Sequence, residues 1–288
     1  MSNKTHYVSL NGKVTSTDQA VISANNSALY YGTGCFETLV AEQSLFFKLN
    51  EHIDRLNRGM EYLSGGTVEP LSADQLKRDI LQLLKRSQLQ KDRVRVRIQF
   101  SLLEESGYSA EQNPQTQLLI TISKAEQSAE PWKLKTSQTR VVSQKSRPTD
   151  LKLSNMLHYR HAWREARSAG FDDAILLTYD DYIAETAIAN LFWKKGNVVY
   201  TPSSLCDILP GIMRNSIIGI IKSRTDLEII EGKYQRSDIM SADSVWMTNS
   251  VRELQEISEI DGQKFETDQP FVSQLKKLLK DYKTEHIS

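Results

Sequence analysis

The segment from Asp92 to Phe100 constrains the fold of this chain more than any other stretch. Polar and apolar residues alternate strictly along it: Val94, Val96, Ile98 and Phe100 fall on one face, and Arg93, Arg95 and Arg97 on the other. A side-chain period of two is typical of a β-strand that buries one face only. We therefore expect a half-buried sheet, with residues 117–122 as the neighbouring strand.

Other segments predict helices mixed with further strands. Apolar residues at helical spacing after Glu51 predict a helix capped by Asn50, and a second helix begins at Ser72 with Gln75 completing a capping box. The remaining expected elements are a hairpin over 7–15, a strand ending at Val40, strands over 174–178, 191–195, 198–201 and 245–248, and helices over 155–169, from about 212 and over 271–282. Strands and helices alternate without a regular βαβ rhythm, which predicts an α+β fold.

The polar stretch from Glu126 to Trp132, which contains Pro131, predicts a domain boundary. We therefore expect a smaller N-terminal domain over 1–125, a linker over 126–132 and a larger C-terminal domain over 133–288.

Charge and composition exclude several classes of function. Lysine plus arginine equals aspartate plus glutamate at 36 each, so nothing indicates a nucleic-acid-binding surface. The sequence contains no apolar run near the ~20 residues that cross a bilayer, and the start MSNKTHYVSL does not resemble a signal peptide. Two cysteines form no disulfide framework, and neither they nor the five histidines show the spacing of a metal site. We expect a soluble, cytoplasmic protein without nucleic-acid or membrane partners and without a metal.

Several residues gain chemical meaning only when they are read together. Lys152 alone is an ordinary surface lysine, Glu185 a salt-bridged or capping glutamate, and Arg55 a charged residue of an amphipathic helix. In sequence order, however, they resemble the active site of the class IV aminotransferase family, the fold-type IV pyridoxal phosphate enzymes, together with Gly211–Met213 and Thr248–Ser250. The resemblance is close in the motifs GCFET, EHIDRL, ANLFWKKGNVVYTP, GIMR and TNSV. The resemblance extends from Tyr31 to Ser250.

The resemblance implies pyridoxal 5′-phosphate as cofactor and Lys152 as the residue that forms a Schiff base with its aldehyde. Glu185 matches the family glutamate that keeps the pyridine nitrogen protonated. This role also explains a carboxylate among small and apolar residues, because burying a carboxylate without a cationic partner is costly. Lys152 and Glu185 are therefore the predicted catalytic residues.

The cofactor's phosphate needs cations and backbone donors. The resemblance assigns this binding to Arg55, which can fork onto phosphate oxygens, and to Gly211, Ile212 and Met213 at the start of a helix. Asn249 and Ser250 complete the predicted phosphate site, with a turn serine as the alternative reading of Ser250.

The sequence leaves the reaction open between two types. The motifs favour a 4-amino-4-deoxychorismate lyase, which eliminates pyruvate to give 4-aminobenzoate for folate biosynthesis. The alternative is an aminotransferase acting on branched-chain or D-amino acids. Phe100 and Ser101 stand where many relatives carry an Arg-Gly pair, the stretch Ser106–Ser109 (SGYS) again resembles the lyases, and Glu37 is a threonine in some lyases.

The substrate residues are less sharply defined. Tyr31, Phe36 and Thr38 lie in the stretch that lines the pocket of relatives, although the two aromatic residues fit a core equally well. Arg97, or an arginine of a partner subunit, can replace the missing arginine as a clamp for a substrate carboxylate. The resemblance further implies a small-molecule amino substrate and a homodimer. A cofactor-binding protein without turnover and a cofactor-free α+β domain are the non-enzymatic alternatives.

Overall fold

The computed structural model describes residues 6–24, 26–104, 114–125, 130–267 and 270–287. Contacts divide the chain into a first unit (1–126, 151–155 and 286–288) and a second unit (127–150 and 156–285). Each unit is built on one β-sheet, in agreement with the predicted α+β class. The SGYS motif at Ser106–Ser109 and residues 126–129 of the predicted linker lie outside the described residues.

The first unit contains a sheet in the order β2-β1-β6-β5-β3-β4. Its strands are β1 (Tyr7–Leu10), β2 (Lys13–Ser16), β3 (Gly34–Glu42), β4 (Leu45–Phe46), β5 (Arg93–Leu102) and β6 (Thr116–Lys124). β5 is the alternating segment predicted from the sequence, and it pairs antiparallel with β3 on one side and with β6 on the other. Val94, Val96, Ile98 and Phe100 are buried, as their alternation predicts.

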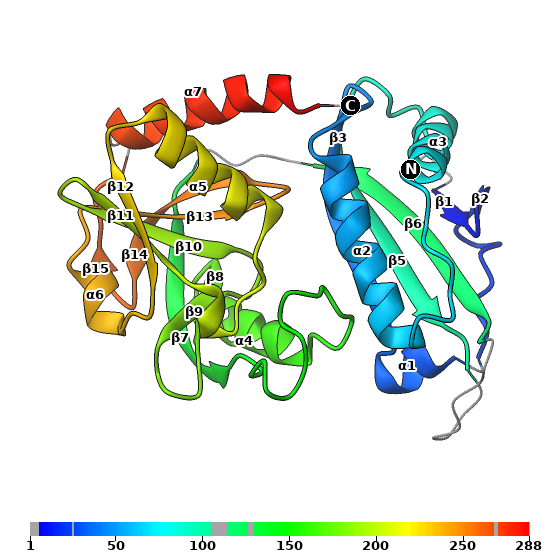
Figure 1. Ribbon diagram of the computed structural model, residues 1–288, viewed down its shortest axis with the longest axis horizontal. Helices are drawn as coiled ribbons and strands as arrows, with labels where there is room; N and C mark the ends of the chain where they lie inside the picture. Colours follow the sequence, from blue (N-terminus) through cyan, green and yellow to red (C-terminus); the bar gives the residue numbers. More distant parts are fainter. Residues whose placement is uncertain (1–5, 25, 105–113, 126–129, 268–269, 288) are drawn as a thin grey trace. The chain divides into compact units, whose positions relative to one another are not determined.

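Helices α1 (Ser27–Tyr31), α2 (Leu49–Ser64) and α3 (Ala73–Arg86) complete the first unit, and α2 lies along β3 and β5 in Figure 1. Ile53, Leu56 and Met60 of α2 are buried in the core with the apolar side chains of β5. α2 begins earlier than predicted, because Lys48 and not Asn50 occupies the N-cap, in a left-handed conformation with φ of 51°. Ser72 does cap α3, and its side chain accepts the amide hydrogen of Gln75.

A short segment returns to the first unit after the chain has entered the second. Leu151–Asn155 belongs to the first unit because it pairs with the start of β3. The Phe36 amide donates to the Lys152 carbonyl at 2.9 Å, and the Ser154 amide donates to the Gly34 carbonyl at 2.8 Å. The domain boundaries predicted from the sequence differ here, since they assign Lys152 to the C-terminal domain. Strand pairing between residues more than a hundred positions apart leaves no mark on the local composition.

The second unit contains a nine-stranded sheet in the order β12-β11-β10-β13-β14-β7-β8-β9, with β15 paired to β14. Its strands are β7 (Trp132–Arg140), β8 (Asp173–Leu177), β9 (Ile183–Thr186), β10 (Asn190–Lys195), β11 (Val198–Pro202), β12 (Glu228–Gly232), β13 (Ser244–Asn249), β14 (Glu253–Ile260) and β15 (Gln263–Lys264). Most pairs are antiparallel, whereas β7 pairs in parallel with β14 and β8, and β11 pairs in parallel with β12. β7 begins at the last residue of the predicted linker.

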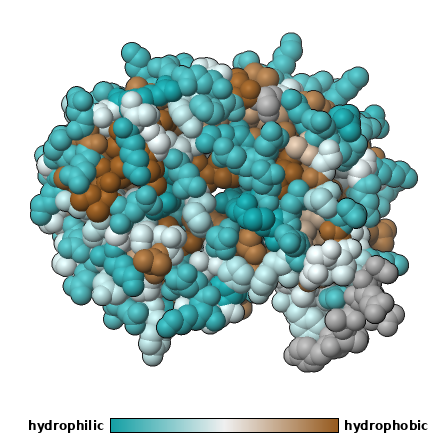
Figure 2. Space-filling view, in the orientation of Figure 1, coloured by the Kyte–Doolittle hydropathy of each residue, from teal (hydrophilic) through white to brown (hydrophobic). Residues whose placement is uncertain are grey.

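Helices cover this sheet: α4 (Leu157–Ser168), α5 (Ile212–Arg224), α6 (Arg236–Met240) and α7 (Pro270–Glu285), together with the 3₁₀ turn η1 (Ser204–Cys206). α5 and α7 lie side by side in Figure 1. No helix in the described part of the chain has the length and apolarity needed to cross a membrane. The face drawn in Figure 2 is mostly hydrophilic, with apolar areas between the polar ones.

Candidate functional site

The residues predicted to bind cofactor and substrate are divided between the two units. Tyr31, Phe36, Thr38, Arg55, Arg97 and Lys152 belong to the first unit, and Glu185, Gly211, Ile212, Met213, Asn249 and Ser250 belong to the second. The two sets are therefore described separately, starting with the lysine.

Lys152 is held by backbone pairing with β3. Its carbonyl accepts the Phe36 amide, and Leu153 forms an isolated antiparallel bridge with Cys35. These bonds fix the backbone from the Lys152 carbonyl onward, so that its side chain projects from an ordered position. The ammonium nitrogen lies 4.9 Å from the centroid of the Phe36 ring, within cation–π range.

Arg97 contacts the same aromatic ring. Its guanidinium carbon lies 3.7 Å from the Phe36 centroid, and its Nη2 donates to Gln99 Oε1 at 2.9 Å. Burial, and next the nearby charge of Arg95, lowers the pKa of Arg97 to about 10, so the side chain remains a cation at neutral pH. Gln99 in turn donates to Ser154 Oγ at 2.8 Å, which links the arginine to the lysine-bearing segment.

The strand register places Thr38 opposite Arg97 and Phe36 opposite Gln99. Phe36, Thr38, Arg97 and the segment around Lys152 therefore share one face of the sheet, as alternation requires. Arg97 and Lys152, which contact the same Phe36 ring, therefore lie on the same side of the sheet. Tyr31 stands at the end of α1 with 48% of its surface exposed.

The opposite face of β3 carries Glu37, which lies in a buried charge cluster with two residues of α2. Arg55 donates from Nε to Glu37 Oε1 at 2.6 Å and from Nη2 to Oε2 at 3.0 Å, and His52 Nδ1 lies 2.7 Å from Oε2. Burial alone raises the pKa of Glu37, but the charges and hydrogen bonds of His52 and Arg55 outweigh it and lower the pKa to about 2. Glu37 is therefore ionised and holds the Arg55 guanidinium in one orientation.

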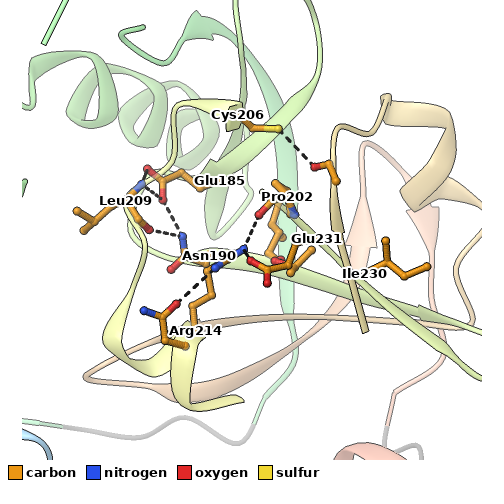
Figure 3. Close-up of polar contacts among 12 residues, drawn as sticks. Glu185, Asn190, Pro202, Cys206, Leu209, Arg214, Ile230 and Glu231 are labelled. Atoms are coloured by element: carbon orange, nitrogen blue, oxygen red, sulfur yellow. Dashed lines mark hydrogen bonds and ion pairs between the residues drawn. The ribbon is translucent and has the colours of Figure 1, made fainter. Parts of the chain in front are cut away.

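In the second unit, Glu185 of β9 is 5% exposed and is surrounded by hydrogen-bond donors (Figure 3). Tyr159 donates its hydroxyl to Oε1 at 2.5 Å, and Asn190 donates from Nδ2 to Oε2 at 2.9 Å. The Leu209 amide lies 3.2 Å and 3.3 Å from the two carboxylate oxygens. Donors on both oxygens favour the ionised form of a carboxylate.

Tyr159 of α4 is bound to this carboxylate as a neutral phenol. Burial, followed by the charge of Glu185, raises the pKa of Tyr159 well above 10. The ring of His158 packs on it with centroids 4.1 Å apart, and burial together with the charge of Arg147 lowers the pKa of His158 to about 4. His158 is therefore uncharged at neutral pH and serves as a packing partner.

Gly211 is the N-cap of α5 and is followed by Ile212 and Met213 in the first helical turn. Gly211 caps the helix without a side-chain hydrogen bond, and the positive end of a helix dipole favours an anion at such a position. A Cβ at Gly211 would lie 2.3 Å from Asn190 Oδ1, so any other residue there would require the Asn190 side chain to move. Arg214, 3% exposed, anchors the same turn by donating from Nη2 to the Pro202 carbonyl and to Glu231 Oε2, both at 2.8 Å (Figure 3).

Asn249 and Ser250 lie where β13 ends. The Asn249 Oδ1 atom accepts the amides of Val251 and Arg252 at 2.9 and 2.8 Å, and its Nδ2 donates to the Ile188 carbonyl at 3.2 Å. The Asn249 side chain thus shapes the turn that carries Ser250. The role of Asn249 and Ser250 in binding the phosphate stays a prediction.

These groups fit the cofactor predicted from the sequence. A buried carboxylate suits a pyridinium nitrogen, and a glycine-capped helix start and an oriented arginine suit a phosphate. The sequence analysis did not predict four residues that surround Arg55 or Glu185, namely Glu37, His52, Tyr159 and Asn190. Asn190 stands within the quoted ANLFWKKGNVVYTP motif, five residues after Glu185, but its spacing alone does not indicate contact with the carboxylate.

Comparison with known proteins identifies relatives over most of the chain. Residues 34–260 match the family described as amino-transferase class IV. The chain is 30% identical over 258 residues to the aminodeoxychorismate lyase of Bacillus subtilis, covering 88% of this chain and 86% of that protein. It is 31% identical over 265 residues to a probable branched-chain-amino-acid aminotransferase of Rickettsia bellii, covering 90% and 89%.

A solved structure shares the fold. The branched-chain aminotransferase of Thermoproteus uzoniensis, crystallised with norvaline, superposes with a TM-score of 0.89 at 21% identity, and the match covers 99% of both chains. With the family match over residues 34–260, this chain belongs to the class IV aminotransferase family, whose cofactor is pyridoxal 5′-phosphate.

Proposed function

We propose that this protein is a pyridoxal phosphate-dependent lyase that converts 4-amino-4-deoxychorismate into 4-aminobenzoate and pyruvate, a step of folate biosynthesis. The observation that carries the cofactor chemistry is the Glu185 carboxylate, which is 5% exposed and bound by donors on both oxygens. The choice of lyase is supported by the Bacillus subtilis relative and by the motifs of the sequence.

In this proposal the cofactor, when bound, supplies a conjugated ring that accepts the electron pair left on a substrate carbon. Lys152 would hold the cofactor covalently through Nζ, and its free amine would move the proton at the amine-bearing carbon of the substrate. Glu185 faces the ring nitrogen and keeps it protonated. Arg55, the backbone of Gly211, Ile212 and Met213, and the Asn249–Ser250 turn bind the phosphate.

Arg97 is the proposed clamp for a substrate carboxylate. It remains cationic and contacts the Phe36 ring that Lys152 also contacts. A guanidinium binds a carboxylate with two parallel hydrogen bonds, which gives orientation as well as affinity. Phe36, Thr38 and Tyr31 are the further residues that we propose to contact the substrate.

An aminotransferase acting on branched-chain or D-amino acids is the second candidate. It is favoured by the Rickettsia bellii relative, which is as similar to this chain as the lyase is. The two reactions differ after the same proton has been removed: a lyase expels pyruvate, whereas an aminotransferase leaves the amino group on the cofactor.

One experiment separates the two candidates. The purified enzyme is incubated with chorismate, glutamine and an aminodeoxychorismate synthase, and 4-aminobenzoate and pyruvate are measured. Both products are expected. Their absence, together with transfer of an amino group from an amino acid to a keto acid, would replace the lyase by the aminotransferase.

Covalent attachment of the cofactor is tested at Lys152. We expect Lys152→Ala to lose the visible absorbance of the bound cofactor and the mass increase after borohydride reduction, while its circular dichroism stays that of the wild type. Lys124→Ala is the control, because Lys124 is 62% exposed and pairs with Asp92 on the surface. Borohydride label on a different lysine would contradict the assignment.

We further propose that the enzyme is a homodimer in the cytoplasm and that its substrate is a small amino compound. Large apolar side chains in the first unit support self-association, since Val21, Leu29 and Tyr30 are 78%, 69% and 57% exposed. The cytoplasmic location rests on the two cysteines, which are both free and buried.

A further inference from the structure

Asn190, the first residue of β10, forms hydrogen bonds with Glu185 and Leu209, which lie 24 residues apart in the sequence. Its side chain is buried, with 5% exposed. Nδ2 donates to Glu185 Oε2 at 2.9 Å and to the Leu209 carbonyl at 2.8 Å (Figure 3). Leu209 stands two residues before Gly211, the N-cap of α5. One amide group thus connects the carboxylate to the turn that begins the helix.

The orientation of this amide follows from the chemistry of its partners. A carboxylate oxygen and a carbonyl oxygen only accept hydrogen bonds, so the nitrogen end of the amide must face both. Its two hydrogens are then fully used. The oxygen end points toward Gly211, where a Cβ would lie 2.3 Å from Oδ1.

The Leu209 backbone closes this network. Its carbonyl accepts from Asn190, while its amide lies 3.2 Å from Glu185 Oε1 and 3.3 Å from Oε2. Glu185, Asn190 and Leu209 therefore form a ring of hydrogen bonds, which joins the carboxylate to the turn at 209–211 both directly and through Asn190. Tyr159 adds a bond to Oε1 from outside the ring.

We propose that Asn190 is a positioning residue that aligns the Glu185 carboxylate and the start of α5 as one rigid element. The inference rests on the proposed function, in which Glu185 faces the ring nitrogen of the cofactor and the start of α5 faces its phosphate. Loss of the amide donor then disturbs both ends of the cofactor together, although Asn190 itself need not contact the cofactor.

Asn190→Asp is the sharpest variant, because it keeps the shape of the side chain and removes both donors. In this variant a carboxylate oxygen replaces Nδ2, which lies 2.9 Å from Glu185 Oε2 and 2.8 Å from the Leu209 carbonyl oxygen, and both of these atoms only accept hydrogen bonds. We expect pyridoxal phosphate to bind the apoprotein about 10- to 100-fold more weakly, the effect of losing one hydrogen bond to a charged group. The pH midpoint of the visible band of the bound cofactor is expected to shift as well.

Asn197→Asp is the matched control. Asn197 lies in the exposed turn between β10 and β11, donates to the Asp226 carbonyl at 3.2 Å, and gives the same change in net charge. Its cofactor affinity and spectral midpoint should equal those of the wild type. Asn190→Ser, which keeps one donor and adds no carboxylate, should lie between wild type and Asn190→Asp.

The measurements are cofactor titration by fluorescence, the pH titration of the visible band, and circular dichroism for the fold. Wild-type affinity and midpoint in Asn190→Asp would overturn the inference. If Asn190→Asp does not fold, the same two shifts are required of Asn190→Ser, and wild-type values there would overturn it. A wild-type protein without a cofactor band would instead refute the proposed function together with the inference.

Discussion

Glu37 is a single residue on which the stability of the first unit depends strongly. It is 1% exposed and neutralises the buried cation Arg55 while also bonding to His52. Removing one partner of a buried ion pair leaves an uncompensated charge, which costs about 3–5 kcal/mol. We expect Glu37→Gln to lower the free energy of unfolding by that amount in urea denaturation.

The control is Glu51→Gln on α2, the helix that carries Arg55. Glu51 is 50% exposed and pairs with Lys48 at 3.1 Å, so its removal should change stability by less than about 1 kcal/mol. An equal change in the free energy of unfolding for the two substitutions would contradict a larger contribution of the buried ion pair.

Glu37 should also affect the binding of the phosphate through Arg55. A guanidinium that loses its bidentate acceptor gains rotational freedom, so we expect Glu37→Gln to weaken binding of pyridoxal phosphate. Binding of pyridoxal, which lacks the phosphate, should change little. An equal loss for both compounds would contradict a role for Glu37 in orienting Arg55 toward a phosphate.

Asp173 makes a residue-level prediction about pH. It is fully buried at the start of β8, and burial raises its pKa from 3.8 to about 7, an effect only partly offset by hydrogen bonds from Thr186, Ala174 and Ile188. Between these two pH values the native protein retains a proton that the unfolded chain has lost. The contribution of protonated Asp173 to the free energy of unfolding is therefore complete below pH 3.8 and is lost as the pH rises through about 7.

Asp173→Asn removes this dependence because an amide does not titrate. We expect the free energy of unfolding of the variant, minus that of the wild type, to increase as the pH rises from about 4 to 8, by on the order of 4 kcal/mol. Urea denaturation at several pH values measures this difference. A difference that stays constant with pH would contradict the raised pKa.

At the scale of an element, α5 carries two glycines with opposite expected responses to alanine. Gly219 lies in the helix interior with open space around it, so Gly219→Ala should stabilise the protein by about 1 kcal/mol. Gly211→Ala places a methyl group against Asn190 and should weaken cofactor binding. Thermal denaturation and cofactor titration measure the two effects, and a stabilising Gly211→Ala with normal binding would contradict the close approach.

Elements with one strong periodic pattern could be predicted from the sequence. β5 alternates along its whole length, and α3 has both a capping serine and an apolar stripe. β14 was missed because its sequence ELQEISEI contains buried polar residues: Glu256 is 5% exposed and lies 3.2 Å from Lys276 of α7. Such a strand owes its burial to a distant partner, which no local pattern reveals.

The same limit applies to the candidate site. Lys152, Glu185 and Arg55 were predicted from an ordered resemblance to known enzymes, and their roles stay predictions. Tyr159 and Asn190 were not identified, because their common partner is Glu185, and contact with one carboxylate depends on how α4, β9 and β10 pack. Packing of this kind is encoded by the whole unit and not by residue spacing.

For the whole molecule we expect a dimer in solution. Light scattering should give twice the chain mass of 32.8 kDa, because a monomer leaves the apolar side chains between Val21 and Tyr30 in water. Leu29→Glu should shift the mass toward a single chain. A wild-type protein that remains monomeric at micromolar concentration would contradict this expectation.

The return of residues 151–155 to the first unit has a consequence for protein engineering. The chain passes between the units at 126/127, 150/151, 155/156 and 285/286, so no single cut separates them. A chimera that exchanged residues 127–285 as a block would import Lys152 from one parent and its pairing partners at Gly34–Phe36 from the other. A functional chimera within this family should therefore take Gly34–Phe36 and residues 151–155 from the same parent protein.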